Sequence, residues 1–408
     1  MKRRVVITGV GLIGAGGMSV SEFWSNLEKG KSSIEKITKC NTSRLNVKYG
    51  GQIKDQLPAG KFNSRFISKC DDFSIYSLYA VDEALKDAKL NTKDIDKDRI
   101  GVYVGNSSGG WHGAEIGLNS LHNEGVEAVS PYLASNWFPA APQGHITIYF
   151  GLKGYSKTVI GDMAGSNIAI GNAFRIIQNG KADYMIAGGS ENLMVAWALM
   201  FYQTNGILSY EDTDPELVYQ PFGEKRSGLV LSEGAAFVVL ESLESAKARN
   251  ADIYCEVAGY GLTNDGYDYI AGSSDGEQYA RCVRIAVKDS IPDLVFLNGA
   301  AHEREDNSEV NGVNTAFKKE IEKVRFTCPK AFYGHCYGAS SSMDVITACY
   351  SMKHNRIIKT GNVVNLADNI NFNMVTKENI SSRVDTALII AKGLGGINSG
   401  IFLNKNVY

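Results

Sequence analysis

The sequence predicts an α/β fold with buried sheets. Short runs of β-branched and other apolar residues recur along the chain, helical patterns lie between them, and glycines separate the two. Such alternation is typical of strands and helices that pack in layers. The predicted strands are residues 5–8, 101–104, 158–160, 184–187, 236–240, 293–297 and 387–391, and the clearest predicted helices are 73–88 and 168–178.

The composition is that of an ordinary globular protein without a strongly charged surface. Of the 408 residues, 44% are hydrophobic and 21% are charged, and the formal net charge is -2. At about 150 residues per domain, this length suggests two or three domains, or one large fold in two parts. The near-neutral charge argues against nucleic-acid binding, which depends on many positive side chains.

The sequence predicts neither a signal peptide nor a membrane span. The apolar run near the N-terminus is short and interrupted by glycines, and no run approaches the 18 or so residues that a membrane-spanning helix needs. The seven cysteines include no CxxC pair, which favours free thiols in a reducing compartment. We therefore expect a cytoplasmic protein.

Two short motifs invite cofactor assignments that their contexts do not support. Residues 9–14 match the GxGxxG pattern of dinucleotide sites, but no clear helix and second strand follow, and no acidic residue ends such a strand about 20 residues on. His335 lies near Cys328 and Cys336, yet no second close pair of ligands completes a zinc site. We expect neither a metal nor another cofactor.

Two segments in opposite parts of the chain are alike. In the first, a predicted strand leads through small residues at 161–166 into a predicted helix. In the second, a similar turn at 335–339 also leads into a predicted helix. The repeat predicts two related halves, residues 1–250 and 251–408.

Five sequence blocks follow one another along nearly the whole chain. They are 3–13 (RRVVITGVGLI), 169–191 (AIGNAFRIIQNGKADYMIAGGSE), 221–241 (PFGEKRSGLVLSEGAAFVVLE), 329–338 (PKAFYGHCYG) and 393–398 (GLGGIN). In these blocks the chain resembles the beta-ketoacyl synthases, the thiolase-fold condensing enzymes of fatty-acid and polyketide synthesis. The resemblance implies a thiolase-like fold with duplicated α-β-α-β-α layered halves.

The residue that accepts the acyl chain in this family is replaced. In the family, a cysteine at a buried helix N-terminus forms a thioester, and backbone amides stabilise the oxyanion. The matching residue is Met163, whose thioether cannot form a thioester. Asp162 replaces a small residue, and a carboxylate there would oppose a thiolate. We expect Asp162 to cap the helix that follows.

One of the family's two histidines is also replaced. These histidines promote malonyl decarboxylation and steady the enolate. Ala300 stands at the first position, although a local shift of the loop would bring His302 there instead. The second survives as His335, and Lys330 of the same motif is retained. We expect this pair to remain as a buried hydrogen-bonded support.

Loss of the nucleophile and one histidine from a complete scaffold resembles the ketosynthase beta subunit, or chain length factor, of type II polyketide synthases. That resemblance implies a protein that does not catalyse by itself and forms a heterodimer with an active ketosynthase alpha subunit. The pair would condense malonyl-acyl carrier protein in the biosynthesis of an antibiotic or pigment, and the beta subunit would set the chain length. The subgroup commonly carries glutamine where Met163 stands, so Met163 argues against a decarboxylase role but not against a structural one.

The same resemblance places a substrate tunnel and an interface. Trp111, Ala114 and Leu118 occupy its gate positions, and their helical spacing puts them on one face. A core-facing helix would show the same stripe. Trp137 and Phe138 lie in a segment that reaches towards the partner, which makes them candidate interface anchors.

Two departures and two alternatives complete the interpretation. Lys392 and Leu394 replace phenylalanines that gate the acyl pocket in active members, which argues against an acyl-accepting pocket. One alternative is an active 3-oxoacyl-acyl carrier protein synthase with another nucleophile, such as Cys336 or Cys328. The other is an acyl-binding or regulatory protein that pairs with itself.

Overall fold

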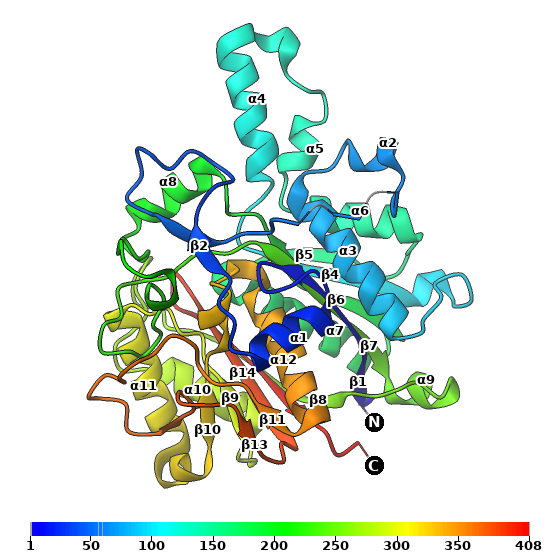
Figure 1. The fold of residues 1–408 in the computed structure, drawn as a ribbon. Coiled ribbons are helices and arrows are strands. Elements are labelled where there is room, and N and C mark those ends of the chain that lie inside the picture. The colour runs from blue at the N-terminus through cyan, green and yellow to red at the C-terminus, as the bar shows by residue number, and fades with distance from the viewer. Residues whose placement is uncertain (1, 56, 59, 408) are drawn as a thin grey trace.

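Eleven strands form one long sheet through the molecule (Figure 1). The structure is a computed structural model that describes residues 2–55, 57–58 and 60–407. From one edge inwards, the first strands are β5 (Lys157–Ile160), β4 (Ile100–Asn106), β6 (Tyr184–Glu191), β7 (Gly234–Ser242) and β1 (Val5–Gly14). The others are β8 (Cys255–Asn264), β15 (Ile397–Asn404), β14 (Thr386–Gly393), β9 (Leu294–Phe296), β10 (Arg325–Thr327) and β12 (Asn373–Met374). Two small ribbons pair β2 (Ile34–Lys36) with β3 (Tyr49–Gly51) and β11 (Arg356–Ile357) with β13 (Ile380–Ser381).

The two parts of the sheet repeat one pattern of strand pairing. In the first part, β5, β4 and β6 are parallel, and β7 and β1 follow as antiparallel partners. In the second part, β10, β9 and β14 are parallel, and β15 and β8 follow as antiparallel partners. Strands β1 and β8 join the two parts. The α/β fold with duplicated halves is confirmed, and we propose residues 1–250 and 251–408 as these halves.

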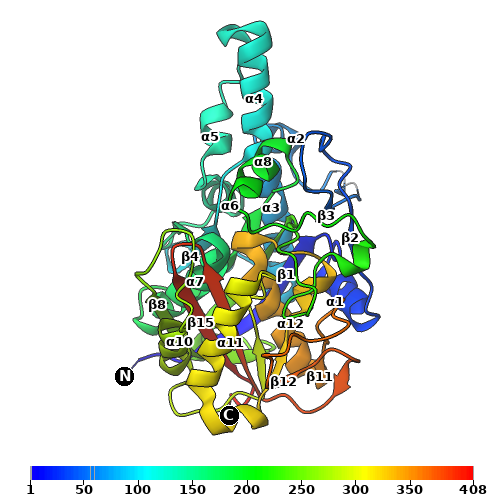
Figure 2. The same ribbon diagram turned by 90° about the vertical axis from the view of Figure 1, so that its left-hand side faces the viewer.

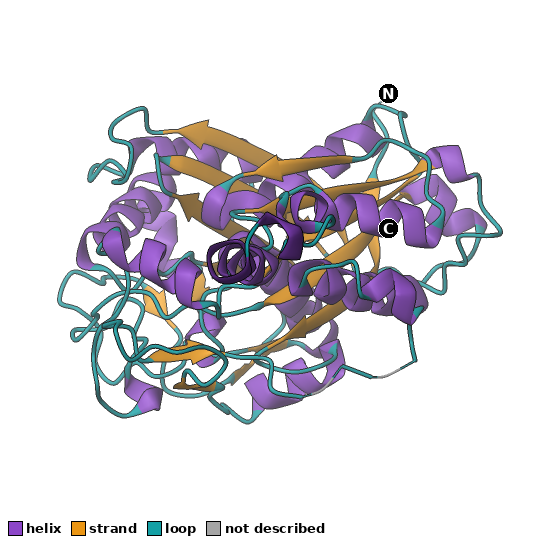
Figure 3. Cartoon of the chain, turned by 90° about the horizontal axis from the view of Figure 1, so that it is seen from above, coloured by secondary structure: helices purple, strands orange, loops and turns teal. Residues whose placement is uncertain are grey.

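Helices cover the sheet in layers, with some of them between two groups of strands (Figure 3). Helix α3 (Asp72–Asp87) packs on β1 and β7, and α10 (Glu277–Val287) packs on β8 and β15. Helices α7 (Gly165–Gln178) and α12 (Ser340–His354) contact each other and form the central layer. The remaining helices are α1 (Val20–Glu28), α2 (Ser64–Ile67), α4 (Trp111–Glu124), α5 (Leu133–Trp137), α6 (Ala141–Phe150), α8 (Ala196–Thr204), α9 (Leu243–Ala248) and α11 (Glu303–Phe317). Within the described ranges, no helix has the length and apolar character needed to cross a bilayer.

The GxGxxG motif at residues 9–14 lies inside strand β1 and not in a turn that could cradle a nucleotide. A Cβ at Gly9 or Gly11 would lie 2.3 Å or 2.0 Å from a carbonyl oxygen of α3. The two glycines therefore allow helix α3 to pack directly on the strand. The next helix, α1, begins only at Val20.

One predicted strand is not buried. The other predicted strands correspond to β1, β4, β6, β7, β9 and β14, whose residues are almost all buried, although β9 is one residue shorter at each end than predicted. Strand β5 instead occupies the end of the sheet next to β4, and Ile160 is 53% exposed. Strand β5 therefore has one edge without a neighbouring strand, and apolar side chains of β5 are exposed there.

Helices α4 and α5 project from the body as an arm, residues 111–137 (Figures 1 and 2). Two glycines precede α4, and the chain passes very close to the end of α5 at this point. The N–H of Gly110 donates to the carbonyl of Trp137 at 3.1 Å, and a Cβ at Gly109 would lie 1.9 Å from the same oxygen. These glycines hold the two ends of the arm together at its base.

Candidate functional site

The positions that correspond to the family's catalytic residues lie deep inside the molecule. Met163 sits in a short 3₁₀ turn (Asp162–Ala164) between β5 and α7, Ala300 follows β9, and His335 precedes α12. Their exposed fractions are 3%, 1% and 0%. Met163 and Ala300 belong to one apolar cluster, which also includes Tyr337. Two of the three positions have therefore become part of the packed core.

The side chain of Met163 makes a polar contact with a neutral amide. Its Sδ lies 3.9 Å from the Nδ2 of Asn298, a contact that a neutral amide makes with a weakly accepting thioether. The side chain is packed with Ala300 and Ala301 in the same cluster. The arrangement can fill space and exclude water, but a thioether cannot take up an acyl group.

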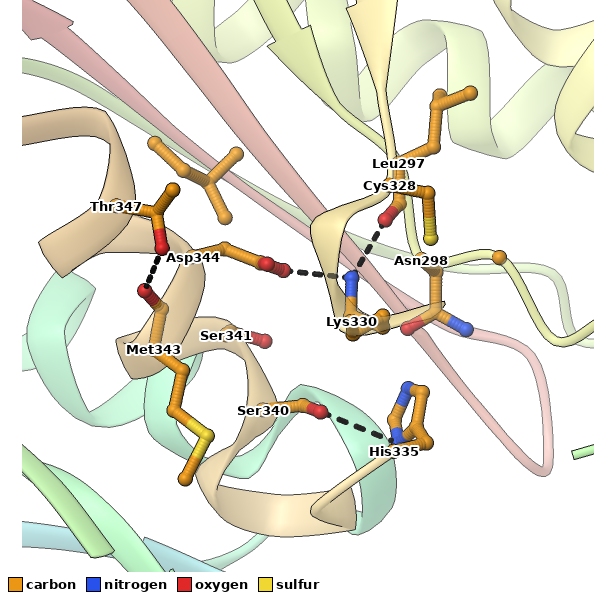
Figure 4. Close-up of polar contacts among 12 residues, drawn as sticks. Leu297, Asn298, Cys328, Lys330, His335, Ser340, Ser341, Met343, Asp344 and Thr347 are labelled. Atoms are coloured by element: carbon orange, nitrogen blue, oxygen red, sulfur yellow. Dashed lines mark hydrogen bonds and ion pairs between the residues drawn. The ribbon is translucent and has the colours of Figure 1, made fainter. Parts of the chain in front are cut away.

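His335 is fully buried and makes contacts through one ring nitrogen (Figure 4). The N–H of Tyr337 donates to its Nδ1 at 3.1 Å, and Ser340 Oγ lies 3.4 Å from the same atom. Because Nδ1 accepts, a neutral imidazole carries its proton on Nε2. Burial, with a contribution from the Lys330 ammonium, holds the pKa of His335 well below its usual value. Nε2 has no hydrogen-bond partner within the described part of the chain.

The neutral state of His335 predicts a pH-dependent contribution to stability. The unfolded imidazole takes up a proton as the pH falls below 6.5, whereas the buried ring resists protonation until the pH is much lower. This contribution is therefore complete above that pH, and below it declines by up to about 1.4 kcal/mol per pH unit. We expect His335→Gln to lack it, so urea unfolding at about pH 7.5 and about pH 5.5 should show the wild type losing more stability than the variant. Equal losses in the two proteins would contradict the neutral assignment.

Lys330 is held by a buried carboxylate that sequence reasoning missed (Figure 4). Its Nζ lies 2.7 Å from Asp344 Oδ2 on α12 and donates to the carbonyl of Leu297 at 2.7 Å. Burial lowers the pKa of Lys330, but Asp344, together with Cys328 and Glu309, outweighs it, and the net result is a raised pKa. The ammonium therefore ties together the loop after β9 and helix α12.

Asp162 does not cap helix α7, contrary to expectation. Its Oδ2 instead accepts a hydrogen bond from the N–H of Leu394 at 2.8 Å, and its Oδ1 accepts one from Ser107 Oγ at 3.1 Å. Burial raises the pKa of Asp162, although these hydrogen bonds act in the opposite direction. The helix cap was the wrong prediction because Asp162 lies at a positive φ of 50°, which turns its carboxyl group towards other loops.

The remaining sequence candidates around this site have separate surroundings. His302 precedes α11 and is half-buried, and burial lowers its pKa. Lys392 forms a buried ion pair with Glu305, at 2.9 Å between Nζ and Oε2. Leu394 packs against the same apolar cluster as Met163. Glu305 was missed in the sequence, because nothing in the spacing connects it with Lys392.

The predicted tunnel residues meet at a cavity of about 650 Å³ at the base of the arm. Trp111, Ala114 and Leu118 line one side of it, and Trp137 of α5 also reaches it. Phe138 is 59% exposed and is not among its lining residues. The whole lining is Trp111, Ala114, Leu118, Val129, Ser130, Pro131, Leu133, Ala134, Trp137, Trp197 and Phe201.

The second wall of this cavity comes from helix α8, which the sequence did not suggest. The rings of Trp111 and Phe201 lie 5.4 Å apart, and those of Trp197 and Phe201 lie 6.4 Å apart. Trp111 also packs on the apolar cluster that contains Met163. Apolar packing is therefore continuous from the turn that contains Met163 to the cavity.

Comparisons with known proteins agree with this scaffold. Residues 2–246 match the model for the beta-ketoacyl synthase N-terminal domain, and residues 254–364 match that for the beta-ketoacyl synthase C-terminal domain. The 3-oxoacyl-[acyl-carrier-protein] synthase 2 of Staphylococcus aureus is 33% identical over 408 residues, which cover 99% of this chain and 98% of the relative.

Solved structures of related proteins superimpose along the whole chain. The ishigamide ketosynthase/chain length factor matches with a TM-score of 0.92 and 26% identity, over 99% of this chain and 100% of that chain. A structure described as a type II PKS acyl-carrier protein in complex with its ketosynthase bound to the hexaketide also contains a matching chain. The TM-score is 0.90 and the identity is 25%, over 99% of this chain and 100% of that chain. These matches confirm the thiolase-like fold, and the chain belongs to the beta-ketoacyl synthase family.

Proposed function

We propose that the chain is a non-catalytic ketosynthase beta subunit, or chain length factor, that pairs with an active ketosynthase alpha subunit. The observation that carries this proposal is the replacement of the acyl-accepting cysteine by Met163 within an otherwise intact scaffold. The position is packed with Ala300 in an apolar cluster, while His335, Lys330 and Asp344 keep their buried contacts. The fold is preserved and the chemistry of its nucleophile is lost.

An unpaired strand edge and exposed apolar side chains support pairing with another subunit. Strand β5 leaves an unpaired edge at the end of the sheet, and an exposed strand edge readily pairs with another chain. Large apolar side chains around this edge and on the arm are exposed, namely Ile116, Leu118, Leu121, Val126, Tyr132, Trp137, Phe138, Ile148, Tyr149 and Ile160. Apolar patches of this kind mark protein interfaces. The ketosynthase alpha subunit is the partner that we assign to it.

The cavity at the base of the arm is the candidate site for the end of the growing chain. Among its lining residues, Ser130 has a hydroxyl group and the tryptophans have indole N–H groups, and the rest of the lining is hydrocarbon. These few donors could not serve every carbonyl of a chain with many keto groups, and each buried carbonyl left without a donor carries a cost. The lining therefore favours a chain end with few polar groups.

An acyl carrier protein is the second partner that we assign. The related ketosynthase whose structure contains the hexaketide is in complex with a type II PKS acyl-carrier protein. In the proposed heterodimer, the cysteine of the alpha subunit would hold the growing acyl chain as a thioester. The malonyl group on the carrier would lose CO2 and attack that thioester, which frees the cysteine thiol and leaves the extended chain on the carrier. The beta subunit would accept the far end of the chain in its cavity and limit the number of extensions.

An active 3-oxoacyl-acyl carrier protein synthase is the second candidate, and the names of the sequence relatives favour it. It requires another nucleophile, yet both cysteines near the site are fully buried. Burial raises the pKa values of Cys328 and Cys336, which disfavours the reactive thiolate. The Sγ of Cys336 also lies 3.6 Å from the carbonyl of Gly234, to which it donates.

The oligomeric state distinguishes the proposal from its alternatives. We expect native mass spectrometry to show a one-to-one heterodimer when this chain is produced with a ketosynthase alpha subunit. Cys328→Ala and Cys336→Ala should leave product formation by that complex unchanged. A stable self-dimer that does not bind the alpha subunit would contradict the proposal and favour a self-associating acyl-binding protein. Loss of product with either cysteine variant, in a complex of normal mass, would favour the active synthase.

A further inference from the structure

The carboxyl group of Asp162 occupies the elbow, which is the 3₁₀ turn of residues 162–164 before helix α7. The carboxyl group is buried, and it accepts hydrogen bonds from the N–H of Leu394 at 2.8 Å and from Ser107 Oγ at 3.1 Å. Two donors from separate parts of the chain, at the ends of β4 and β14, therefore meet at one carboxyl group.

The local backbone is shaped for this arrangement. Asp162 lies at φ 50°, in the left-handed region that Asp tolerates better than most residues. Gly393 allows the close approach from the other side, because a Cβ there would lie 3.3 Å from Asp162 Oδ2. Ser107 is fixed in turn by the hydroxyl of Tyr202 at 3.1 Å and by Glu191, which accepts from its N–H.

The donors around Asp162 are those that an acyl-transfer site presents to a developing oxyanion. Backbone N–H groups that point into a buried, water-free position stabilise negative oxygen strongly. Here one such group, the N–H of Leu394, already donates to a carboxyl group of the chain itself, together with the hydroxyl of Ser107. The carbonyl oxygen of a thioester would need the same donors and the same space.

We propose that Asp162 fills an anion-binding site at the elbow and so excludes an acyl carbonyl from it, independently of the loss of the nucleophile. The inference rests on contacts within this chain and holds whether or not the proposed alpha subunit is its partner. The competing interpretation is that Asp162 merely braces the loop at residues 393–396. Under that interpretation, removing the carboxyl group would loosen the loop without creating a site for an anion.

The test introduces a thiol at position 163 and compares its reactivity with and without the carboxyl group of Asp162. Met163→Cys supplies the thiol, and the purified chain is treated with iodoacetamide, with the modified peptide identified by mass spectrometry. We expect the double variant Asp162→Gly/Met163→Cys to be alkylated at the elbow at least about tenfold faster than Met163→Cys alone, as for a thiol pKa lower by about one unit. Glycine is chosen because it tolerates the positive φ.

Asp162→Asn/Met163→Cys is the matched control, because asparagine keeps the shape and the acceptor oxygen and also tolerates the positive φ. We expect its rate to lie between those of the other two variants, since the charge is removed while the position stays filled. Equal alkylation rates in Met163→Cys and the double glycine variant would overturn the proposal, whether both are fast or both are slow.

A second measurement does not depend on access of a reagent to the thiol. Removal of the carboxyl group by Asp162→Gly should leave a site for formate, a small carboxylate. We expect formate to raise the melting temperature of Asp162→Gly above its value in chloride at equal ionic strength, and to have no such effect on the wild type or on Asp162→Asn. Equal responses in all three proteins would show that no anion site is vacated and would overturn the proposal.

Discussion

Replacement of Asp344 by alanine is expected to lower the free energy of unfolding by about 3–5 kcal/mol. The carboxylate lies 2.7 Å from Lys330 Nζ, and both side chains are almost fully buried. Without it the ammonium keeps only the carbonyl of Leu297 as a partner within the described part of the chain, so most of its desolvation cost is no longer offset. Urea unfolding of the purified chain measures the change.

A pair of controls separates this effect from ordinary loss of a salt bridge. Glu320→Ala removes the partner of Lys323 in an exposed ion pair and should cost less than about 1 kcal/mol. Lys330→Met combined with Asp344→Leu removes both charges and should recover much of the lost stability. A cost below about 1 kcal/mol for Asp344→Ala would show that the buried pair is not essential to the fold.

Enlarging Ala114 to phenylalanine is expected to shorten the product of the complex by one or more extension units. Ala114 is buried on the arm helix and lines the cavity, so a phenyl ring there would occupy space that the chain end needs. Trimming Trp111 to alanine should lengthen or scatter the products, because the indole forms a wall of the same cavity. Liquid chromatography with mass spectrometry of the products reads out both changes.

Asn119→Ala provides the matched control for these variants. Asn119 lies on the same helix, is exposed, and does not line the cavity. Its replacement should leave the product distribution unchanged. The same distribution in the wild type, Ala114→Phe and Trp111→Ala would exclude the cavity as the site that sets chain length.

The alternation of strand and helix patterns predicted the α/β class, and the resemblance to the beta-ketoacyl synthases located the positions of the missing cysteine and histidine. The strand and helix patterns and the motif around His335 each lie within a short segment. The exposure of β5 was not predicted, because its short apolar run resembles those of buried strands. Strand β5 is exposed because it lies at the end of the sheet, and its place in the sheet is determined by the topology.

Contacts across the fold could not be predicted for the same reason. Asp344 and Glu305 become visible as partners of Lys330 and Lys392 only when their helices are placed. Asp162 was expected to cap its own helix, but its bonds go to Leu394, 232 positions away in the chain. Local signals describe a residue's own segment, and these polar side chains act between segments.

Helical spacing predicted one wall of the cavity but not the wall that faces it. Spacing placed Trp111, Ala114 and Leu118 on one face, and all three line the cavity. The facing wall, with Trp197 and Phe201 on α8, lies outside that segment and could not be inferred from it. The tunnel role of these residues stays a prediction.

Acyl labelling of the two subunits tests the central claim most directly. The complex of this chain with an active ketosynthase alpha subunit is treated with an electrophilic acyl probe, and the intact mass of each subunit is measured. We predict that the alpha subunit gains one acyl group while this chain keeps its unmodified mass, both in the complex and alone. Stoichiometric acylation of this chain, at the loop around Met163 or at Cys328 or Cys336, would contradict the claim that it is a non-catalytic subunit.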